Sequence, residues 1–349
     1  MANLNAVEAK FEAQKIAFAP LAFQAAYALR ELGILEVIGK AGKNGVSVEK
    51  IAEQCGLSHY GVRVLAEIGA GMGILKNAEH GYAIDKTGYF ILQDDMTRVN
   101  MNFVQDVCYN GAKFLTESVK NSKPEGLRVF GQWNTIYEAL SKLPPQVQKS
   151  WFEFDHFYSD IAFPEALPIV FRQKRNKLMD IGGNTAKWAL ACCKYSPDVN
   201  VAIVDLPGQT EMAKGNIEKA GFANRISTFA SNILQKDSPL PQDADAVWMS
   251  QFLDCFSLEQ ITSIIAKIVK YTPAADIFVL EPLWDMQRFE ASSYSLQATS
   301  LYFTCMANGN SKMYGFKELV NAVEKAGVRL IEANHNLGAN SYSLLLFRK

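Results

Sequence analysis

The stretch KLMDIGGNTAKWALACCKYSPDVNVAIVDLP, residues 177–207, decides the fold of this chain. It begins with a short apolar segment that predicts a strand ending at Asp180, followed by a glycine-rich turn. The pattern then predicts a helix from about Thr185 to Tyr195 and a second strand that ends at Asp205. A strand, a glycine turn, a helix, a strand and an acid in this order are typical of a nucleotide-binding βαβ unit.

The residue types of this unit indicate its ligand. Gly182 and Gly183 let the backbone approach a ligand closely and adopt conformations that other residues avoid. The carboxylate of Asp205 can accept hydrogen bonds from both hydroxyls of a ribose. The turn DIGGNTA lacks the complete GxGxxG spacing that places a pyrophosphate at a helix N-terminus. An adenosyl group without phosphates therefore fits better than NAD, which stays the second nucleotide candidate.

The rest of the C-terminal half repeats the alternation of strands and helices. Residues 225–233, 245–271 and 276–284 each contain a further strand, and residues 317–349 predict a helix followed by two strands. A terminal strand pair is common where a parallel sheet ends in an antiparallel edge. We therefore predict an α/β fold, a Rossmann-like, doubly wound sheet of about seven strands.

The N-terminal half has a different pattern. Apolar residues recur at helical spacing over 21–32, and two further helices meet at 56–58, where Ser58 is expected to cap the second helix. The stretch LKNAEHGYAIDKTGYFIL, residues 75–92, alternates like two strands that turn near 79–81. A helix, a turn, a helix and a hairpin in this order predict a winged helix.

A winged helix often binds DNA, but this one lacks the necessary charges. The helix that would enter the major groove, residues 59–72, offers Arg63 as its cation and also carries Glu67. The formal net charge of the chain is −1, which gives no broad basic face for phosphates. We expect no nucleic-acid partner, and we expect this half to pack against a second subunit.

Residues 101–171 are unusually aromatic, and two interpretations remain open. In the first, the aromatic side chains form the core of a helical bundle that connects two domains. In the second, the segment WFEFDHFYSD, residues 151–160, lines a pocket for a planar apolar ligand, because Asp155, His156 and Asp160 lie among the aromatic residues.

The composition sets the remaining limits. A chain of 349 residues with 49% hydrophobic and 20% charged residues is expected to form two folded domains. The first fifteen residues resemble no signal peptide, and no apolar run is long enough to span a bilayer, so a cytoplasmic protein without membrane contact is expected. The six cysteines show no metal-ligand spacing, so no metal is expected.

The motifs LMDIGGNTA and VDLP resemble the corresponding motifs of the plant-type O-methyltransferase family, which also occurs in bacterial natural-product pathways. The similarity covers nearly the whole chain and is strongest over 177–207. It implies a winged-helix dimerisation domain over 1–100, a helical connector lining the substrate site over 101–172, and a class I methyltransferase domain over 173–349. It also implies S-adenosylmethionine as the cofactor, S-adenosylhomocysteine as its product, and a homodimer.

The resemblance also assigns residues to the cofactor, and the aromatic stretch 101–171 supplies the residues expected at the acceptor. The residues expected to bind the cofactor are Asp180, Gly182, Gly183, Asp205, Leu206, Asn232, Ile233, Ser250 and Gln251. The residues expected to bind the acceptor are Tyr109, Phe157, Tyr158 and Asp160.

The chain departs from the family pattern at several positions. Asn184 and Ala186 replace two glycines of the turn, and Asp254 stands where the family carries its catalytic histidine. Glu281 matches the first acid that supports this histidine, whereas Met313 aligns with the second.

These departures leave three interpretations of Asp254. It acts as the base if burial raises its pKa, or it orients His156 as part of a pair that moves the proton, or it merely caps the following helix or hydrogen-bonds the backbone. The expected catalytic residues are Asp254, His156 and Glu281.

The expected function is the methylation of a small aromatic, phenolic acceptor in secondary metabolism. Deprotonation of a phenol also makes its ortho carbon nucleophilic, so methylation of oxygen and of a ring carbon both remain open. The alternative is a protein that binds the cofactor without turnover, because the usual histidine and one acid are missing. A winged-helix regulator is the third and weakest interpretation.

Overall fold

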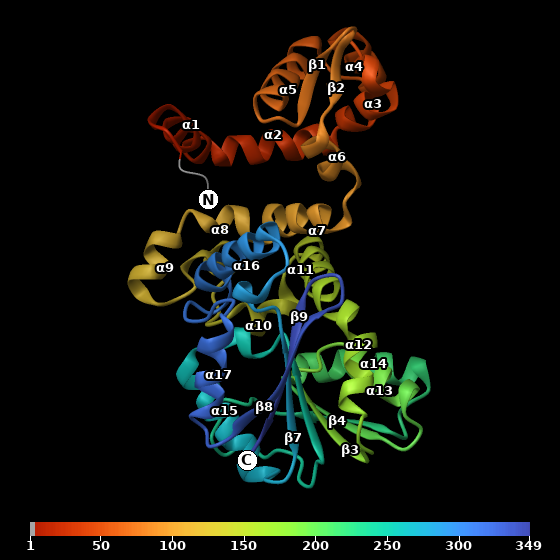
Figure 1. The fold of residues 1–349 in the computed structure, drawn as a ribbon, viewed down its shortest axis with the longest axis vertical. Coiled ribbons are helices and arrows are strands. Elements are labelled where there is room, and N and C mark those ends of the chain that lie inside the picture. Colours follow the sequence, from red (N-terminus) through yellow and green to blue (C-terminus); the bar gives the residue numbers. More distant parts are fainter. Residues whose placement is uncertain (1–3) are drawn as a thin grey trace. The chain divides into compact units, whose positions relative to one another are not determined.

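The computed structural model describes residues 4–349, except the side chains of residues 158 and 159. The chain divides into two compact units, Met1–Asn102 and Phe103–Lys349 (Figure 1). The expected further division of the second unit at residue 172 stays a prediction.

The first unit is helical apart from one short hairpin. Its elements in chain order are α1 (Ala6–Ala17), α2 (Ala19–Glu31), α3 (Ile34–Ala41), α4 (Val48–Cys55), α5 (His59–Gly71), β1 (Leu75–Ala78), β2 (Gly81–Ile84), α6 (Lys86–Gln93) and the start of α7 (Asp95–Phe103). Apolar residues such as Leu29 of α2, Ile38 of α3 and Ile51 of α4 are fully buried in a common core. In contrast, α1 contains no buried residue.

The predicted order of helix, turn, helix and hairpin is confirmed in this unit. The Ser58 side chain caps α5 as expected, because its oxygen accepts a hydrogen bond from the N–H of Gly61 at 3.1 Å. The cation of this helix, Arg63, lies 3.6 Å from the carboxylate of Glu49.

The predicted strand over residues 85–92 is wrong, because β2 ends at Ile84 and a helix, α6, follows it. Ile91 and Leu92 pack against the core at helical spacing from Gly88, which is itself buried. A Cβ on Gly88 would lie 2.3 Å from the carbonyl oxygen of Ile74, so the core accepts only glycine there. The apparent alternation of the sequence therefore hides a helical face.

The second unit starts with helices and continues as an α/β domain. Its helices before the sheet are α8 (Tyr109–Ala112), α9 (Leu115–Asn121), α10 (Ile136–Ala139), α11 (Pro145–Ser159) and α12 (Phe163–Val170). The elements that follow are β3 (Lys177–Ile181), α13 (Lys187–Tyr195), β4 (Asn200–Asp205), α14 (Pro207–Ala220), β5 (Ile226–Ala230), β6 (Ala246–Ser250), α15 (Leu258–Tyr271), β7 (Asp276–Glu281), α16 (Glu290–Tyr302), α17 (Phe316–Glu324), β8 (Arg329–Leu337) and β9 (Tyr342–Arg348).

The strands of the second unit form one seven-stranded sheet in the order β5-β4-β3-β6-β7-β9-β8. The first five are parallel, and β9 runs antiparallel to both β7 and β8, so the predicted sheet with an antiparallel end is confirmed. Helices α12, α13 and α14 lie on one face, and α15 and α17 lie on the other (Figure 1). The chain order reverses between β3 and β6, which places a crevice at the carboxyl ends of these strands.

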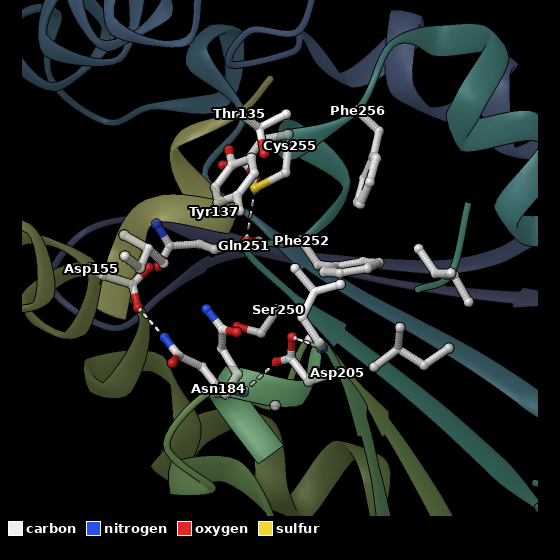
Figure 2. Close-up of a pocket in the computed structure, with 18 of the residues that line it drawn as sticks. Thr135, Tyr137, Asp155, Asn184, Asp205, Ser250, Gln251, Phe252, Cys255 and Phe256 are labelled. Atoms are coloured by element: carbon white, nitrogen blue, oxygen red, sulfur yellow. Dashed lines mark hydrogen bonds between the residues drawn. The ribbon is translucent and has the colours of Figure 1, made fainter. Parts of the chain in front are cut away.

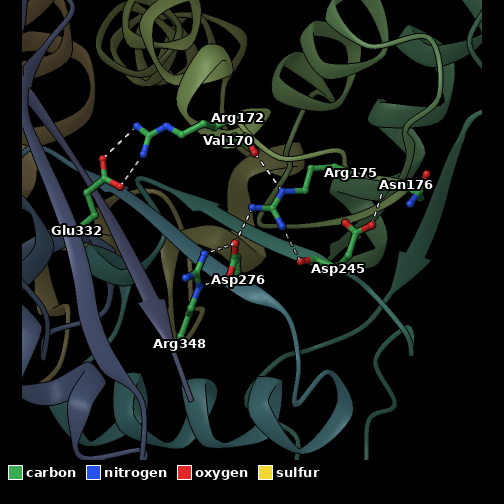
Figure 3. A network of polar contacts seen from close by, with 8 residues as sticks. All are labelled: Val170, Arg172, Arg175, Asn176, Asp245, Asp276, Glu332 and Arg348. Atoms are coloured by element: carbon green, nitrogen blue, oxygen red, sulfur yellow. Dashed lines mark hydrogen bonds and ion pairs between the residues drawn. The ribbon is translucent and has the colours of Figure 1, made fainter.

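At the amino ends of the parallel strands, opposite the crevice, ion pairs connect neighbouring strands (Figure 3). The carboxylate of Asp276, the first residue of β7, accepts hydrogen bonds from Arg175 at 2.6 Å and from Arg348 at 2.6 Å. A second Arg175 nitrogen donates to the carbonyl oxygen of Asp245 at 3.3 Å. These contacts join the amino ends of β3, β6 and β7 to the end of β9.

None of the helices in the described part of the chain combines the length and the apolar character needed to cross a bilayer.

Candidate active site

A cavity of about 330 Å³ opens at the carboxyl ends of β3, β4 and β6. Asp180, Asp205 and Ser250 reach it from these three strands, and Figure 2 shows the last two beside the loop that follows β3. Phe154 of α11 and Tyr302 of α16 supply aromatic walls. This size and this mixture of apolar walls with a few polar groups are typical of small-molecule sites.

The loop after β3 has room for glycine alone at two positions. Gly182 has a φ of +75°, and a Cβ there would lie 2.3 Å from the ring of Phe252. A Cβ on Gly183 would lie 2.7 Å from Oδ2 of Asp180. Both glycines therefore keep the backbone close to the cavity, as the sequence predicts.

Two further residues of this loop have a left-handed backbone conformation although they carry side chains. Asn184 has a φ of +45° and Ala186 has a φ of +70°. Because Ala186 is not helical, α13 begins at Lys187 and not at Thr185 as predicted. The loop thus keeps the backbone path of a glycine-rich turn without two of its glycines.

The carboxylates at the two strand ends are desolvated. Asp180 is 2% exposed, and burial followed by the charge of Asp205 raises the pKa of Asp180 to about 8. Its Oδ2 has no hydrogen-bond partner among the described residues. Asp205 accepts the N–H groups of Asn184 at 2.9 Å and of Leu206 at 2.7 Å, while burial raises its pKa to about 6. Both carboxylates would gain from a ligand that brings hydroxyl donors or positive charge.

This donor set fits S-adenosylmethionine better than a dinucleotide. The carboxylates that line the cavity belong to Glu138, Asp155, Asp160, Asp180, Asp205 and Asp254. Lys187 also lines it, but its ammonium pairs with Asp160 at 3.0 Å. A pyrophosphate would meet repulsion in such a cavity, whereas a sulfonium and an ammonium would be attracted. Asp205 would hold the ribose, and Asp180 with Gly182 would flank the amino-acid end.

Asp254 lines the cavity and interacts with Glu281, which stands behind it. Oε1 of Glu281 accepts the N–H groups of Phe252 at 3.0 Å and of Leu253 at 2.8 Å, so Glu281 fixes the turn that carries Asp254. Burial and the charge of Asp254 raise the pKa of Glu281 well above its ordinary range.

Asp254 itself is poised to exchange a proton near neutral pH. It is 4% exposed and lines the cavity, and its Oδ1 accepts a hydrogen bond from the thiol of Cys255 at 3.4 Å. Burial raises the pKa of Asp254 to about 7. The interpretation that it merely caps the next helix is wrong, because Ser257 caps α15 and forms a capping box with Gln260.

His156 lies in the cavity wall, and its described polar contacts are with Asp160 and Thr185. Its Nδ1 lies 3.8 Å from Asp160, and its Nε2 lies 3.3 Å from the hydroxyl of Thr185. Burial opposes its protonated form, yet the interaction with Asp160 and the charge of Asp155 raise the pKa of His156. Among the described contacts none joins His156 to Asp254, so the predicted pair receives no support from the geometry.

The structure gathers most of the predicted site residues in one cavity. Its wall includes Asp180, Gly182, Gly183, Asp205, Leu206, Asn232, Ile233, Ser250, Gln251, Asp254, His156 and Asp160. Glu281 stands behind this wall, and Tyr109 and Phe157 are not among the described residues that form it. The predicted contact of Tyr158 falls on a side chain outside the described residues.

Other residues of the site were not predicted. Phe252 covers Gly182, and Tyr137 and Cys255 line the same cavity (Figure 2). Asn184 was noted only as a missing glycine, although its side chain donates a hydrogen bond to Asp155 at 3.1 Å. The signal that could have found it is the tolerance of asparagine for left-handed backbone.

Comparisons with known proteins agree with this geometry. Residues 113–328 match the model of the O-methyltransferase domain, and residues 10–82 match the Dimerisation2-like domain. The chain is 24% identical over 317 residues to the L-tyrosine C(3)-methyltransferase of Streptomyces lavendulae, which covers 89% of this chain and 85% of that protein. It is 29% identical over 107 residues to the 3-hydroxy-5-methyl-1-naphthoate 3-O-methyltransferase of Streptomyces sahachiroi, or 31% of this chain and 30% of that protein.

The solved structure of the mitomycin 7-O-methyltransferase MmcR shares the fold, with a TM-score of 0.72 at 18% identity and with 98% of each chain covered. The O-methyltransferase model matches well over half of the chain, and the cavity fits the methyl donor of that family. The chain therefore belongs to the O-methyltransferase domain family and is an S-adenosylmethionine-dependent methyltransferase.

Proposed function

We propose that this enzyme methylates an oxygen or a ring carbon of a small phenolic acceptor in secondary metabolism. The observation that carries the proposal is the position of Asp254, a buried carboxyl that lines the same cavity as the donor-binding loop and Asp205. Phe154, Tyr302 and other aromatic side chains enclose this part of the cavity and suit a planar ring.

When bound, S-adenosylmethionine supplies an activated methyl group on a sulfonium. Asp254 would accept the phenolic proton, since a base whose pKa lies near 7 is half ionised at neutral pH. Glu281 would hold the turn of Asp254 through the N–H groups of Phe252 and Leu253. The aromatic walls would orient the ring and thereby select oxygen or carbon as the nucleophile.

The test starts with the purified protein. Mass spectrometry should detect copurified S-adenosylhomocysteine, and a panel of phenols with labelled methyl donor should then reveal transfer. The panel should include L-tyrosine and hydroxynaphthoates, because two relatives are named for such acceptors. NMR of the product separates a methoxy group from a ring methyl group. Binding of NAD without binding of S-adenosylhomocysteine would overturn the proposal.

A second candidate function is cofactor binding without turnover. Met313, which stands in place of the second supporting acid, is 3% exposed and lines the cavity with an apolar side chain. This function would give tight binding of S-adenosylhomocysteine but no transfer to any phenol of the panel.

We also propose that the chain forms a homodimer through its first unit. Helix α1 has no buried residue, and its apolar side chains Val7, Phe11 and Ile16 are 79%, 55% and 76% exposed. Such a helix is expected to be covered by a partner, and residues 10–82 match a dimerisation domain. Sedimentation velocity should give a dimer, and Phe11→Asp with Ile16→Asp should give a monomer. A monomeric parent chain would contradict this assignment. Binding of DNA by the first unit would instead favour a winged-helix regulator.

A further inference from the structure

The end of helix α11 is tied to the loop after β3 by three polar contacts. Nδ2 of Asn184 donates to Asp155 at 3.1 Å, and the hydroxyl of Thr185 lies 3.3 Å from Nε2 of His156. The ammonium of Lys187 pairs with Asp160 at 3.0 Å. We call these three contacts, Asn184–Asp155, Thr185–His156 and Lys187–Asp160, the clasp.

Asn184 is the centre of the clasp because it holds two carboxylates at once. Its backbone N–H donates to Oδ2 of Asp205 at 2.9 Å, and its side chain donates to Oδ2 of Asp155 (Figure 2). One residue thus links the carboxylate expected to hold the ribose with a carboxylate of the helix that lines the acceptor side of the cavity.

The backbone of Asn184 explains why asparagine serves here. Its φ of +45° is left-handed, a conformation that glycine adopts freely and that asparagine tolerates better than most residues with a side chain. Glycine at this position would keep the N–H that reaches Asp205 but would have no group to reach Asp155. The side chain of Asn184 therefore adds a connection that the loop itself does not need.

We propose that Asn184 is a positioning residue that couples the donor-binding loop to helix α11, so that binding of the donor orders the acceptor side of the cavity. This inference rests on the proposed function, because it takes the loop and Asp205 as the donor site and α11 as the acceptor wall. By thermodynamic reciprocity, ordering of α11 by an acceptor must then strengthen binding of the donor by the same factor.

Four variants separate the coupling from the binding of the donor. Asn184→Gly removes the link to Asp155 and keeps the link to Asp205. Asn184→Asp has nearly the same shape but places a carboxylate against Asp155, whereas Asn184→Asp with Asp155→Asn exchanges the two groups and restores an amide–carboxylate pair. Asn216→Ala is the matched control, because Asn216 donates to the carbonyl oxygen of Thr185 at 3.1 Å and none of its described hydrogen bonds reaches α11.

The experiment measures hydrogen exchange of the α11 amides with and without S-adenosylhomocysteine, beside calorimetry of the same ligand. In the parent chain and in Asn216→Ala, the ligand should slow exchange over residues 152–160 by about 10-fold, within the range usual for coupled sites. Asn184→Gly should bind the ligand within about 3-fold of the parent chain but lose this protection. Asn184→Asp should lose it too, and the exchanged pair should regain part of it.

Two results would overturn the coupling: full ligand-dependent protection in Asn184→Gly, or an exchanged pair that protects no better than Asn184→Asp. Failure of the proposed function looks different, because the parent chain itself would then not bind S-adenosylhomocysteine. In that case hydrogen exchange measured without ligand still tests whether the clasp holds α11. Exchange over residues 152–160 should be faster in Asn184→Asp than in the parent chain, and equal rates would reject the clasp.

Discussion

Buried carboxyl groups have opposite pKa shifts at the two ends of the parallel strands. We call these ends the amino edge and the carboxyl edge of the sheet. At the amino edge, Asp276 is held between Arg175 and Arg348, whose hydrogen bonds and charges overcome the effect of burial and lower its pKa. At the carboxyl edge, burial raises the pKa of Asp180 to about 8 and that of Asp254 to about 7. No arginine is found among the described residues that line the cavity there.

The difference distinguishes carboxylates that stabilise the fold from carboxylates that we expect to contact a ligand. A buried charge is tolerated when it is paired and hydrogen-bonded, and otherwise costs free energy. Asp276 meets this condition within the chain. Oδ2 of Asp180 and Oε2 of Glu281, by contrast, have no hydrogen-bond partner among the described residues. We expect a ligand or a shared proton to supply what is missing at the carboxyl edge.

The largest expected effect comes from breaking the amino edge. Asp276→Asn leaves Arg175, whose side chain is 7% exposed, without its carboxylate, and should lower the free energy of unfolding by about 3–5 kcal/mol. Urea denaturation measures this loss. The control is Arg172→Met, because Arg172 and Glu332 form a pair whose side chains are 60% and 31% exposed, which should contribute at most about 1 kcal/mol. Equal losses in both variants would show that burial does not decide the value of these pairs.

At the carboxyl edge, Asp254→Asn should remove the base and leave the fold intact. We expect kcat to fall by about 100- to 1000-fold, within the range usual for a general base. In the parent enzyme, kcat should rise with pH through about 7, as Asp254 loses its proton, and this rise should vanish in the variant. Binding of S-adenosylhomocysteine should change little. A variant that keeps near-normal turnover would exclude Asp254 as the base.

Asp205→Asn tests the donor side of the same edge. The amide can accept one of the two backbone N–H groups that Asp205 now accepts, but it carries no charge to offer a ribose. A lost hydrogen bond to a charged group corresponds to a rise in the Kd of S-adenosylhomocysteine by about 10- to 100-fold, which calorimetry measures. An unchanged Kd would show that Asp205 does not bind the ribose.

The sequence predicted the parts of the fold that follow from local patterns. The seven strands and the antiparallel end of the sheet were predicted, because strands such as β3, β4, β6, β7 and β9 are short, mostly apolar runs with clear ends. The strand predicted over residues 85–92 failed because the core contacts of Gly88 depend on Ile74, which lies far from it in the sequence. The start of α13 was missed because the left-handed conformation of Ala186 leaves no mark in its residue type.

The site shows the same division. The residues at the ends of β3 and β4 follow directly from the motif of the βαβ unit, and the cavity includes them. The contacts of His156 could not be predicted, since they depend on how α11 lies against the loop after β3. The ion pairs of Asp276 were not predicted either, because Arg175 lies 101 residues away in the sequence.

The smallest expected effect is a fall in stability with rising pH. It is caused by the buried carboxyl groups at the carboxyl edge. The folded-state pKa values of Asp180, Asp205 and Asp254 all lie above the ordinary value of 3.8, at about 8, 6 and 7. The folded chain therefore binds more protons than the unfolded chain between pH 4 and 8, and its stability must fall as the pH rises. Asp276 has the opposite shift and acts only below about pH 4.

Urea denaturation of the ligand-free chain should thus show a free energy of unfolding that falls by about 1–2 kcal/mol from pH 7 to pH 8. Asp180→Asn should flatten this slope, because it removes the group with the highest of the three values, whereas Asp276→Asn should lower the whole curve and keep the slope. A stability that stays level or rises over this range would mean that the carboxylates of the cavity already have partners. The comparison between the two edges of the sheet would then lose its physical basis.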